Sequence, residues 1–81
     1  MRVHCRLFAR YAEVLGTEAL ALDLPERSRV ADAVARVRAT IPNGHLLPER
    51  PLVAVNREHV LPSRPLHDGD ELAFLPPLAG G

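Results

Sequence analysis

The residues best suited to chemistry lie in the last segment of the sequence, Pro76-Pro77-Leu78-Ala79-Gly80-Gly81. Each proline fixes φ near −65° and favours an extended backbone, so this segment is expected to project from the rest of the chain. The side chains then shrink toward the diglycine, as in a peptide that enters a narrow tunnel where a Cβ would collide with the walls. We therefore expect a globular domain over residues 1–75 and an extended tail over residues 76–81.

The reactive group of such a tail would be the α-carboxyl of Gly81. With an ordinary pKa of about 3.3–3.7, this group is ionised at neutral pH and is a poor electrophile. A partner enzyme could activate it as a mixed anhydride with AMP. Attack by a sulfur donor on that anhydride would leave a thiocarboxylate, which is a good sulfur nucleophile. Gly80 and Gly81 could equally form a frayed end without function, and terminal glycines alone do not decide between the two interpretations.

Other candidate groups favour a structural role. The single cysteine, Cys5, excludes an internal disulfide and any multi-cysteine metal site. It alternates with Val3 and Leu7 and is therefore expected to be buried and unreactive. The four histidines show no ligand spacing, and the carboxylates of residues 68–71 lack the spaced pattern of an EF-hand loop. No metal site is predicted.

Composition narrows the classes of partner. The 81 residues carry ten basic and ten acidic side chains, a formal net charge of +0, and every basic residue is an arginine. This balance argues against a nucleic-acid or acidic-lipid surface, which would need a basic excess. No apolar run approaches the roughly 18 residues of a membrane span, and the first residues interleave charge with apolar side chains, unlike a signal peptide. We expect a cytoplasmic protein with no membrane or nucleic-acid partner.

The elements that must position the tail can be expected from hydrophobic periodicity. Strands are expected at residues 3–8, 19–24, 52–55, 59–61 and 72–75. A short helix is expected over residues 10–15, ended by Gly16 in the left-handed region. A longer helix is expected to begin with Ser28 as its N-cap and to end at Pro42-Asn43-Gly44. Gly69 is expected to adopt a positive φ in the turn before the last strand.

This order of elements fits a two-layer α+β domain, in which one long amphipathic helix covers one face of a mixed sheet of about five strands. The β-grasp, ubiquitin-like fold has this order. In the last strand, alternation turns Leu72 and Phe74 inward and Leu75 outward. Phe8 likewise lies opposite the inward face of the first strand, so Phe8 and Leu75 are expected to form an exposed apolar patch, typical of an interface. Arg6 and Arg10 flank the patch, either to meet acidic residues of a partner or as ordinary solvated charges.

Three segments carry a resemblance to a known family. They are Phe8-Ala9 with the following Glu13 and Gly16, then Ala54-Val55-Asn56, and finally residues 65–81, with the Asp68-Gly69-Asp70 turn, the proline pair and the diglycine in register. With them, the sequence resembles the small subunits of molybdopterin synthase, which are ubiquitin-like sulfur carriers. The related thiamine-pathway carriers also end in diglycine but usually lack the phenylalanine and proline-pair stretch.

The resemblance implies a function for the tail. An adenylyltransferase related to ubiquitin-activating enzymes would use ATP to adenylate Gly81, and a sulfur donor would convert the adenylate to a thiocarboxylate. The tail would then deliver sulfur to a cyclic pyranopterin precursor in the active site of a large synthase subunit, within a heterotetramer of two small and two large subunits. The carrier itself would bind no cofactor and would not be a catalyst alone.

The resemblance also implies which residues contact partners. Phe8, His59 and Leu75 match the family's partner-contact positions, and the tail residues Pro76, Pro77, Leu78 and Ala79 would enter the large subunit. Two positions depart from the family: an arginine is often found where this chain has Ala12, and position 59 is commonly apolar where this chain has His59. Both departures concern the partner surface and leave the chemistry of Gly81 untouched.

Alternative functions are a sulfur carrier for thiamine thiazole or tRNA thiolation, and a β-grasp interaction module whose glycines have no chemical role.

Overall fold

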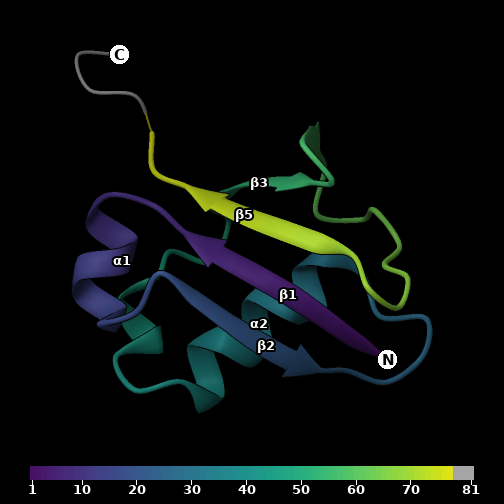
Figure 1. Ribbon diagram of the computed structural model, residues 1–81, viewed down its shortest axis with the longest axis horizontal. Helices are drawn as coiled ribbons and strands as arrows, with labels where there is room; N and C mark the ends of the chain where they lie inside the picture. Colours follow the sequence, from purple (N-terminus) through teal and green to yellow (C-terminus); the bar gives the residue numbers. More distant parts are fainter. Residues whose placement is uncertain (78–81) are drawn as a thin grey trace.

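A computed structural model describes residues 1–77 of the chain. Its elements, in chain order, are β1 (Arg2–Leu7), α1 (Arg10–Leu15), β2 (Ala19–Asp23), α2 (Val30–Thr40), the 3-10 helix η1 (Gly44–Leu46), β3 (Leu52–Val55), β4 (Glu58–Val60) and β5 (Glu71–Leu75). The strands form one five-stranded sheet in the order β2-β1-β5-β3-β4. Figure 1 shows α2 behind the sheet, and the outer face of the sheet turned toward the viewer.

The centre of the sheet pairs strands from the two ends of the chain. β1 and β5 are parallel, whereas β1 with β2, β3 with β4 and β3 with β5 are antiparallel. Such a mixed sheet with one covering helix confirms the expected α+β class and β-grasp architecture. The central pairing also means that the end of β5, from which the tail leads, lies beside the end of β1 (Figure 1).

The core forms where the alternation predicted it. Val3, Cys5 and Leu7 of β1 are each at most 2% exposed, and Leu72 and Phe74 of β5 are fully buried. They pack against the inward face of α2, whose buried residues are Val30, Ala33, Val34 and Val37. In β1 and β5, one face of the strand therefore lies in the core and the other face points outward.

The start of α2 differs from the prediction. Arg29, not Ser28, is the N-cap residue, and its backbone N–H donates to the carboxylate of Asp32 at 2.7 Å. Ser28 is buried, and its hydroxyl donates to the carbonyl of Pro25 at 2.7 Å. The serine was the wrong choice because its side chain satisfies the preceding turn, while a carboxylate inside the first turn satisfies the helix end.

Gly44 also has a different role from the one expected. The left-handed residue after α2 is Asn43, with φ 64°, whereas Gly44 begins η1 and is buried. A Cβ at position 44 would collide with the carbonyl oxygen of Val37. Gly44 is therefore needed for the close approach of η1 to α2, and not to end the helix. Gly16 and Gly69 do adopt positive φ values, 69° and 85°, as expected.

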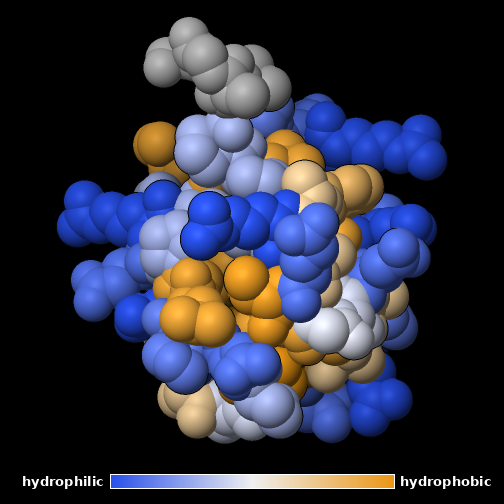
Figure 2. Space-filling model, turned by 90° about the vertical axis from the view of Figure 1, so that its left-hand side faces the viewer, coloured by the Kyte–Doolittle hydropathy of each residue, from blue (hydrophilic) through white to orange (hydrophobic). Residues whose placement is uncertain are grey.

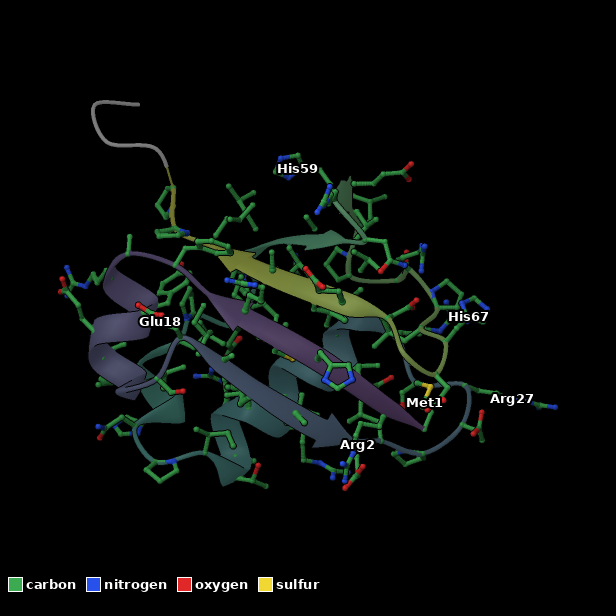
Figure 3. The ribbon with its side chains drawn as sticks, in the orientation of Figure 1. Met1, Arg2, Glu18, Arg27, His59 and His67 are labelled. Atoms are coloured by element: carbon green, nitrogen blue, oxygen red, sulfur yellow. The ribbon has the colours of Figure 1, made fainter. Side chains whose placement is uncertain are left out.

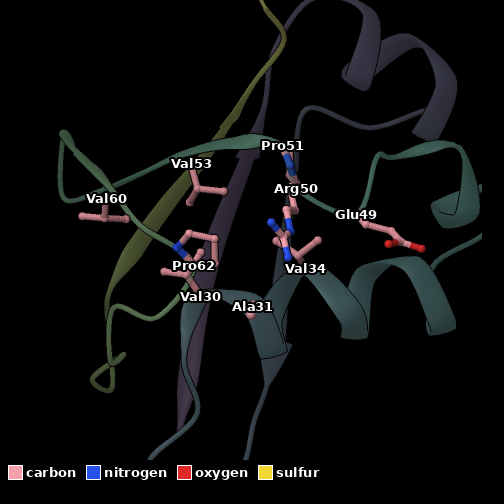
Figure 4. A pocket seen from close by; sticks show the side chains of 9 residues that line it. All are labelled: Val30, Ala31, Val34, Glu49, Arg50, Pro51, Val53, Val60 and Pro62. Atoms are coloured by element: carbon pink, nitrogen blue, oxygen red, sulfur yellow. The ribbon is translucent and has the colours of Figure 1, made fainter.

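A small hollow separates α2 from β3 and β4. It has a volume of about 20 Å³, and the valines Val30, Val34, Val53 and Val60 contribute to its walls (Figure 4). This volume is close to that of a single water probe, so the hollow is a packing defect and not a ligand site.

The β3–β4 turn is fastened to the beginning of β5. Asn56 and Arg57 both have positive φ in this turn. The side-chain amide of Asn56 donates to the Asp70 carboxylate at 3.0 Å, and its oxygen accepts from the N–H of Glu71 at 3.0 Å. Asp70 also accepts from the N–H of His67 at 2.8 Å. These bonds position β5, and with it the tail, relative to the β3–β4 hairpin.

Candidate functional site

The predicted apolar pair lies at the end of the sheet where the central strands β1 and β5 both finish. The parallel register aligns Leu7 with Phe74, so that Phe8 and Leu75 are the next residues of the two adjacent chains. Phe8 is 41% exposed and Leu75 is half-buried. Leu75 is also paired with Leu52 of β3 across the sheet. Large apolar side chains therefore meet at the end of the sheet from which the tail leads.

A groove lies beside this end of the sheet. It has a volume of about 910 Å³ and is called the tail groove below. Its lining comes from the start of α1, the segment around η1, three strands and the first tail residues: Ala9, Arg10, Tyr11, Leu46, Pro48, Leu52, His59, Leu75, Pro76 and Pro77. Leu46 and Leu52 are about half exposed, at 54% and 51%. Figure 2 shows this end of the molecule, where exposed hydrophobic residues gather in the middle of the face with hydrophilic side chains around them.

The backbone at the groove is strained at Ala9, which joins β1 to α1. Ala9 has φ 49° and ψ −125°, a combination that residues other than glycine rarely adopt. The following helix is held in place because Tyr11 donates its N–H to the carbonyl of Phe8 at 3.1 Å, and the Tyr11 side chain is buried. This turn sets Phe8 outward and Tyr11 inward at the groove.

The charged and basic side chains of the groove are Arg10 and His59, and no carboxylate contributes to its lining. Figure 3 shows His59 projecting outward from the β4 edge of the sheet. The lining of the groove is thus mainly apolar with two basic side chains, a surface suited to a protein partner more than to a small polar ligand.

The tail residues can be placed in part. Pro76 is half-buried against the groove and Pro77 is exposed. The predicted site residues Leu78, Ala79, Gly80 and Gly81 lie outside the described residues. The chemistry expected at Gly81 therefore stays a prediction. The structure does describe the surface around Pro76 and Pro77, at the base of the tail.

Cys5 is excluded as a chemical group by its surroundings. It is 1% exposed, and burial raises the pKa of its thiol to about 12, so it is protonated and inaccessible at neutral pH. Over residues 1–77 no group of three or more His, Cys, Asp or Glu side chains is arranged to hold a metal ion. Within the same range no helix is long and apolar enough to span a membrane.

Sequence reasoning missed four lining residues: Tyr11, Leu46, Pro48 and Leu52. Tyr11 and Leu52 belong to elements that were predicted, but the adjacency of β3 to β5 could not be read from periodicity. Leu46 and Pro48 lie in a segment expected to be irregular, and nothing in the sequence indicated that it returns to the tail. The available signal was the pair Leu46-Leu47 before Pro48, of which Leu46 alone is exposed.

Comparisons with known proteins match this chain over most or all of its length. A profile of the ThiS family matches residues 5–81. The molybdopterin synthase sulfur carrier subunit of Escherichia coli is 39% identical over 80 residues, covering 91% of this chain and 93% of that protein. The subunit of the same name from Chlamydomonas reinhardtii is 32% identical and is covered completely, as is this chain.

Solved structures show the same fold. The small archaeal modifier protein 1 of Haloferax volcanii has a TM-score of 0.85 at 27% identity, with 100% of both chains covered. A chain of the complex of subunits 1 and 2 of molybdopterin-converting factor from Helicobacter pylori has a TM-score of 0.72 at 22% identity, again with both chains fully covered, and supports the fold.

Proposed function

The chain belongs to the ThiS family, and from that premise we propose that it is the sulfur carrier subunit of a molybdopterin synthase. The observation that carries the proposal is the match to molybdopterin synthase sulfur carrier subunits over at least 91% of this chain, together with a family match that reaches Gly81. The family match extends over the positions of Gly80 and Gly81, which supports a chemical role for the diglycine over a β-grasp module with an idle end.

The sulfur is proposed to be carried on the α-carboxyl of Gly81. Attack of this carboxylate on the α-phosphorus of ATP, in the active site of an adenylyltransferase, forms the acyl-adenylate and releases pyrophosphate. A sulfide equivalent from a sulfur donor then attacks the acyl carbon. The C–S bond forms, the bond to the AMP oxygen breaks, and the thiocarboxylate remains. Burial of Cys5 supports this assignment, because the chain offers no accessible thiol as an alternative carrier.

The globular domain is proposed to serve as the recognition surface. Phe8, His59 and Leu75 would contact the large synthase subunit beside the tail groove, while residues 76–79 enter its active site. The same surface would contact the adenylyltransferase, since both enzymes must reach one tail. The heterotetramer with two large subunits, the use of ATP by the partner only, the absence of a bound cofactor and the cytoplasmic location belong to this proposal.

A carrier for thiamine thiazole or tRNA thiolation would use the same chemistry with other partners. The name of the matching family alone does not separate these pathways. The relatives from Escherichia coli and Chlamydomonas reinhardtii share the name of the molybdopterin synthase subunit, and they favour that pathway.

The function can be tested by sulfur transfer to the pyranopterin precursor in a reaction with the large subunit, the adenylyltransferase, ATP and a sulfur source. We expect dithiolene formation with the natural carrier and none when Gly81 is deleted or one residue is added after it. A carrier with one extra residue before Met1 is the matched control and is expected to remain active. Activity of the Gly81 deletion would contradict the proposed chemistry, and inactivity of the natural carrier would contradict the pathway.

A further inference from the structure

The outer face of the sheet contains one row of residues with a basic side chain toward either end and small residues between them. Arg6 of β1 is aligned with Ala73 of β5, Ala73 with Ala54 of β3, and Ala54 with His59 of β4. Ala73 is half-buried and Ala54 is 6% exposed, and each side chain is a single methyl group, so no bulky side chain of this row stands between the two basic residues. These four residues are called the basic row below. Three strand spacings of about 4.8 Å place its two ends roughly 14 Å apart at the backbone.

Neither end of the basic row is neutralised by the part of the chain that the structure describes. The cross-strand neighbours of Arg6 are Ala19 and Ala73, which carry no charge. Across residues 1–77 no carboxylate lies within 4.0 Å of Arg6 or His59. Arg2, on the same face, shows the contrast: its cross-strand neighbour is Asp23, and the two side chains form an ion pair at 2.9 Å.

The basic row is continuous with the surface proposed to bind partners. The row adjacent to it, two residues further along β5 and two residues back along β3, contains the paired Leu75 and Leu52. His59 belongs to both the basic row and the tail groove, where Arg10 contributes a guanidinium group. An apolar strip flanked by basic side chains is complementary to an apolar partner surface flanked by carboxylates.

We propose that the large synthase subunit presents two acidic side chains to this carrier, one to Arg6 and one to His59, over the alanines between them. The proposal rests on the proposed function for the identity of the partner and goes beyond it by assigning the electrostatic complement. Arg6 supplies a fixed positive charge, and the His59 imidazole donates a hydrogen bond to the facing carboxylate. Because Ala73 and Ala54 are small, the partner can approach the strand backbone closely enough for both contacts to form at once.

The test measures the dissociation constant of the complex between the carrier and the large subunit from the same source. Isothermal titration calorimetry gives this constant at low and at high salt. The variants Arg6→Glu and His59→Glu place a like charge opposite each expected carboxylate. We expect each to weaken binding about tenfold at low salt, and we expect this loss to shrink at high salt, because screening reduces charge–charge effects. Arg6→Gln, which removes the charge without reversing it, is expected to have an intermediate effect.

Arg27→Glu is the matched control, because Arg27 is exposed and lies at the end of the molecule opposite the tail (Figure 3). It changes the formal net charge by the same two units as Arg6→Glu, and by more than His59→Glu, and is expected to alter the affinity less than twofold. Circular dichroism checks that each variant is folded. If Arg6→Glu and His59→Glu both bind like the natural chain, the acidic complement is refuted while the carrier function stands. If the natural chain does not bind the large subunit at all, both the partner and the complement are refuted.

Discussion

At the scale of single residues, Cys5 has a structural role and takes no part in sulfur chemistry. A thiol in a protein of a sulfur-transfer pathway invites a chemical role, but Cys5 lies in the middle of β1 with its side chain in the core. Desolvation by the surrounding core is the cause of its raised pKa. The residue therefore acts as a small apolar side chain.

The raised pKa of Cys5 predicts a specific pH dependence of stability. In the unfolded chain the thiol ionises near its ordinary pKa of 9.0, whereas in the folded chain its pKa is about 12. Above about pH 9 the unfolded state therefore loses a proton that the folded state keeps, and the free energy of unfolding falls as pH rises. Comparing the natural chain with Cys5→Ala by urea unfolding isolates this effect. Between about pH 8 and pH 10.5 we expect the natural chain to lose about 2 kcal/mol more than the variant. Parallel pH profiles would show that the thiol is accessible to water.

Gly44 provides a second prediction at this scale. Gly44→Ala places a Cβ against the carbonyl of Val37, which belongs to the backbone and cannot move without distorting α2. We expect a loss of more than about 2 kcal/mol in the free energy of unfolding. Gly16→Ala is the control, since its φ of 69° is strained for alanine but no atom lies within 4 Å of the new Cβ. Its expected cost is about 1 kcal/mol. An equal or smaller loss at position 44 would refute the close-approach explanation.

At the scale of elements, the sequence pattern predicted correctly those features that depend on neighbouring residues in the chain. Alternation placed β1 and β5 and their inward residues, and Gly16 ended α1 at the expected residue. The errors arose where two local solutions compete. Ser28 and Asp32 can each satisfy the first turn of α2, and only the three-dimensional path of residues 25–29 decided for Asp32. Gly44 has its role because of a contact between two elements, which no periodicity expresses.

The link between the β3–β4 turn and β5 can be tested at Asn56. Asn56→Ala removes the hydrogen bonds to Asp70 and to the N–H of Glu71 and also strains the backbone, since Asn56 has φ 49°. We expect it to lower the free energy of unfolding by about 2 kcal/mol or more. Asn56→Gly removes the same bonds but tolerates the positive φ, so its loss should be smaller than that of alanine yet at least about 1 kcal/mol. A glycine variant as stable as the natural chain would show that the side-chain bonds contribute nothing.

At the scale of the whole molecule, the strand order creates the candidate site. Placing β5 between β1 and β3 brings residues 9–11, 46, 48, 52, 59 and 75–77 together around the tail groove. The sequence allowed Phe8 and Leu75 to be assigned to the outward face, because each follows from its own strand. It did not allow Leu46, Pro48 or Leu52 to be assigned to the same groove, because their proximity depends on pairings between distant segments. The globular domain thus surrounds the base of the tail with an apolar, basic-edged surface.

The central claim, that sulfur is carried on the carboxyl of Gly81, has one direct measurement. The carrier is incubated with its adenylyltransferase, ATP and a sulfur source, and its intact mass and the mass of its last peptide are recorded. The account predicts a mass gain equal to the exchange of one oxygen for sulfur, confined to the peptide that contains Gly81. The same gain is predicted for Cys5→Ala. An unchanged mass under conditions in which a known carrier is converted, or sulfur located on Cys5, would contradict the account.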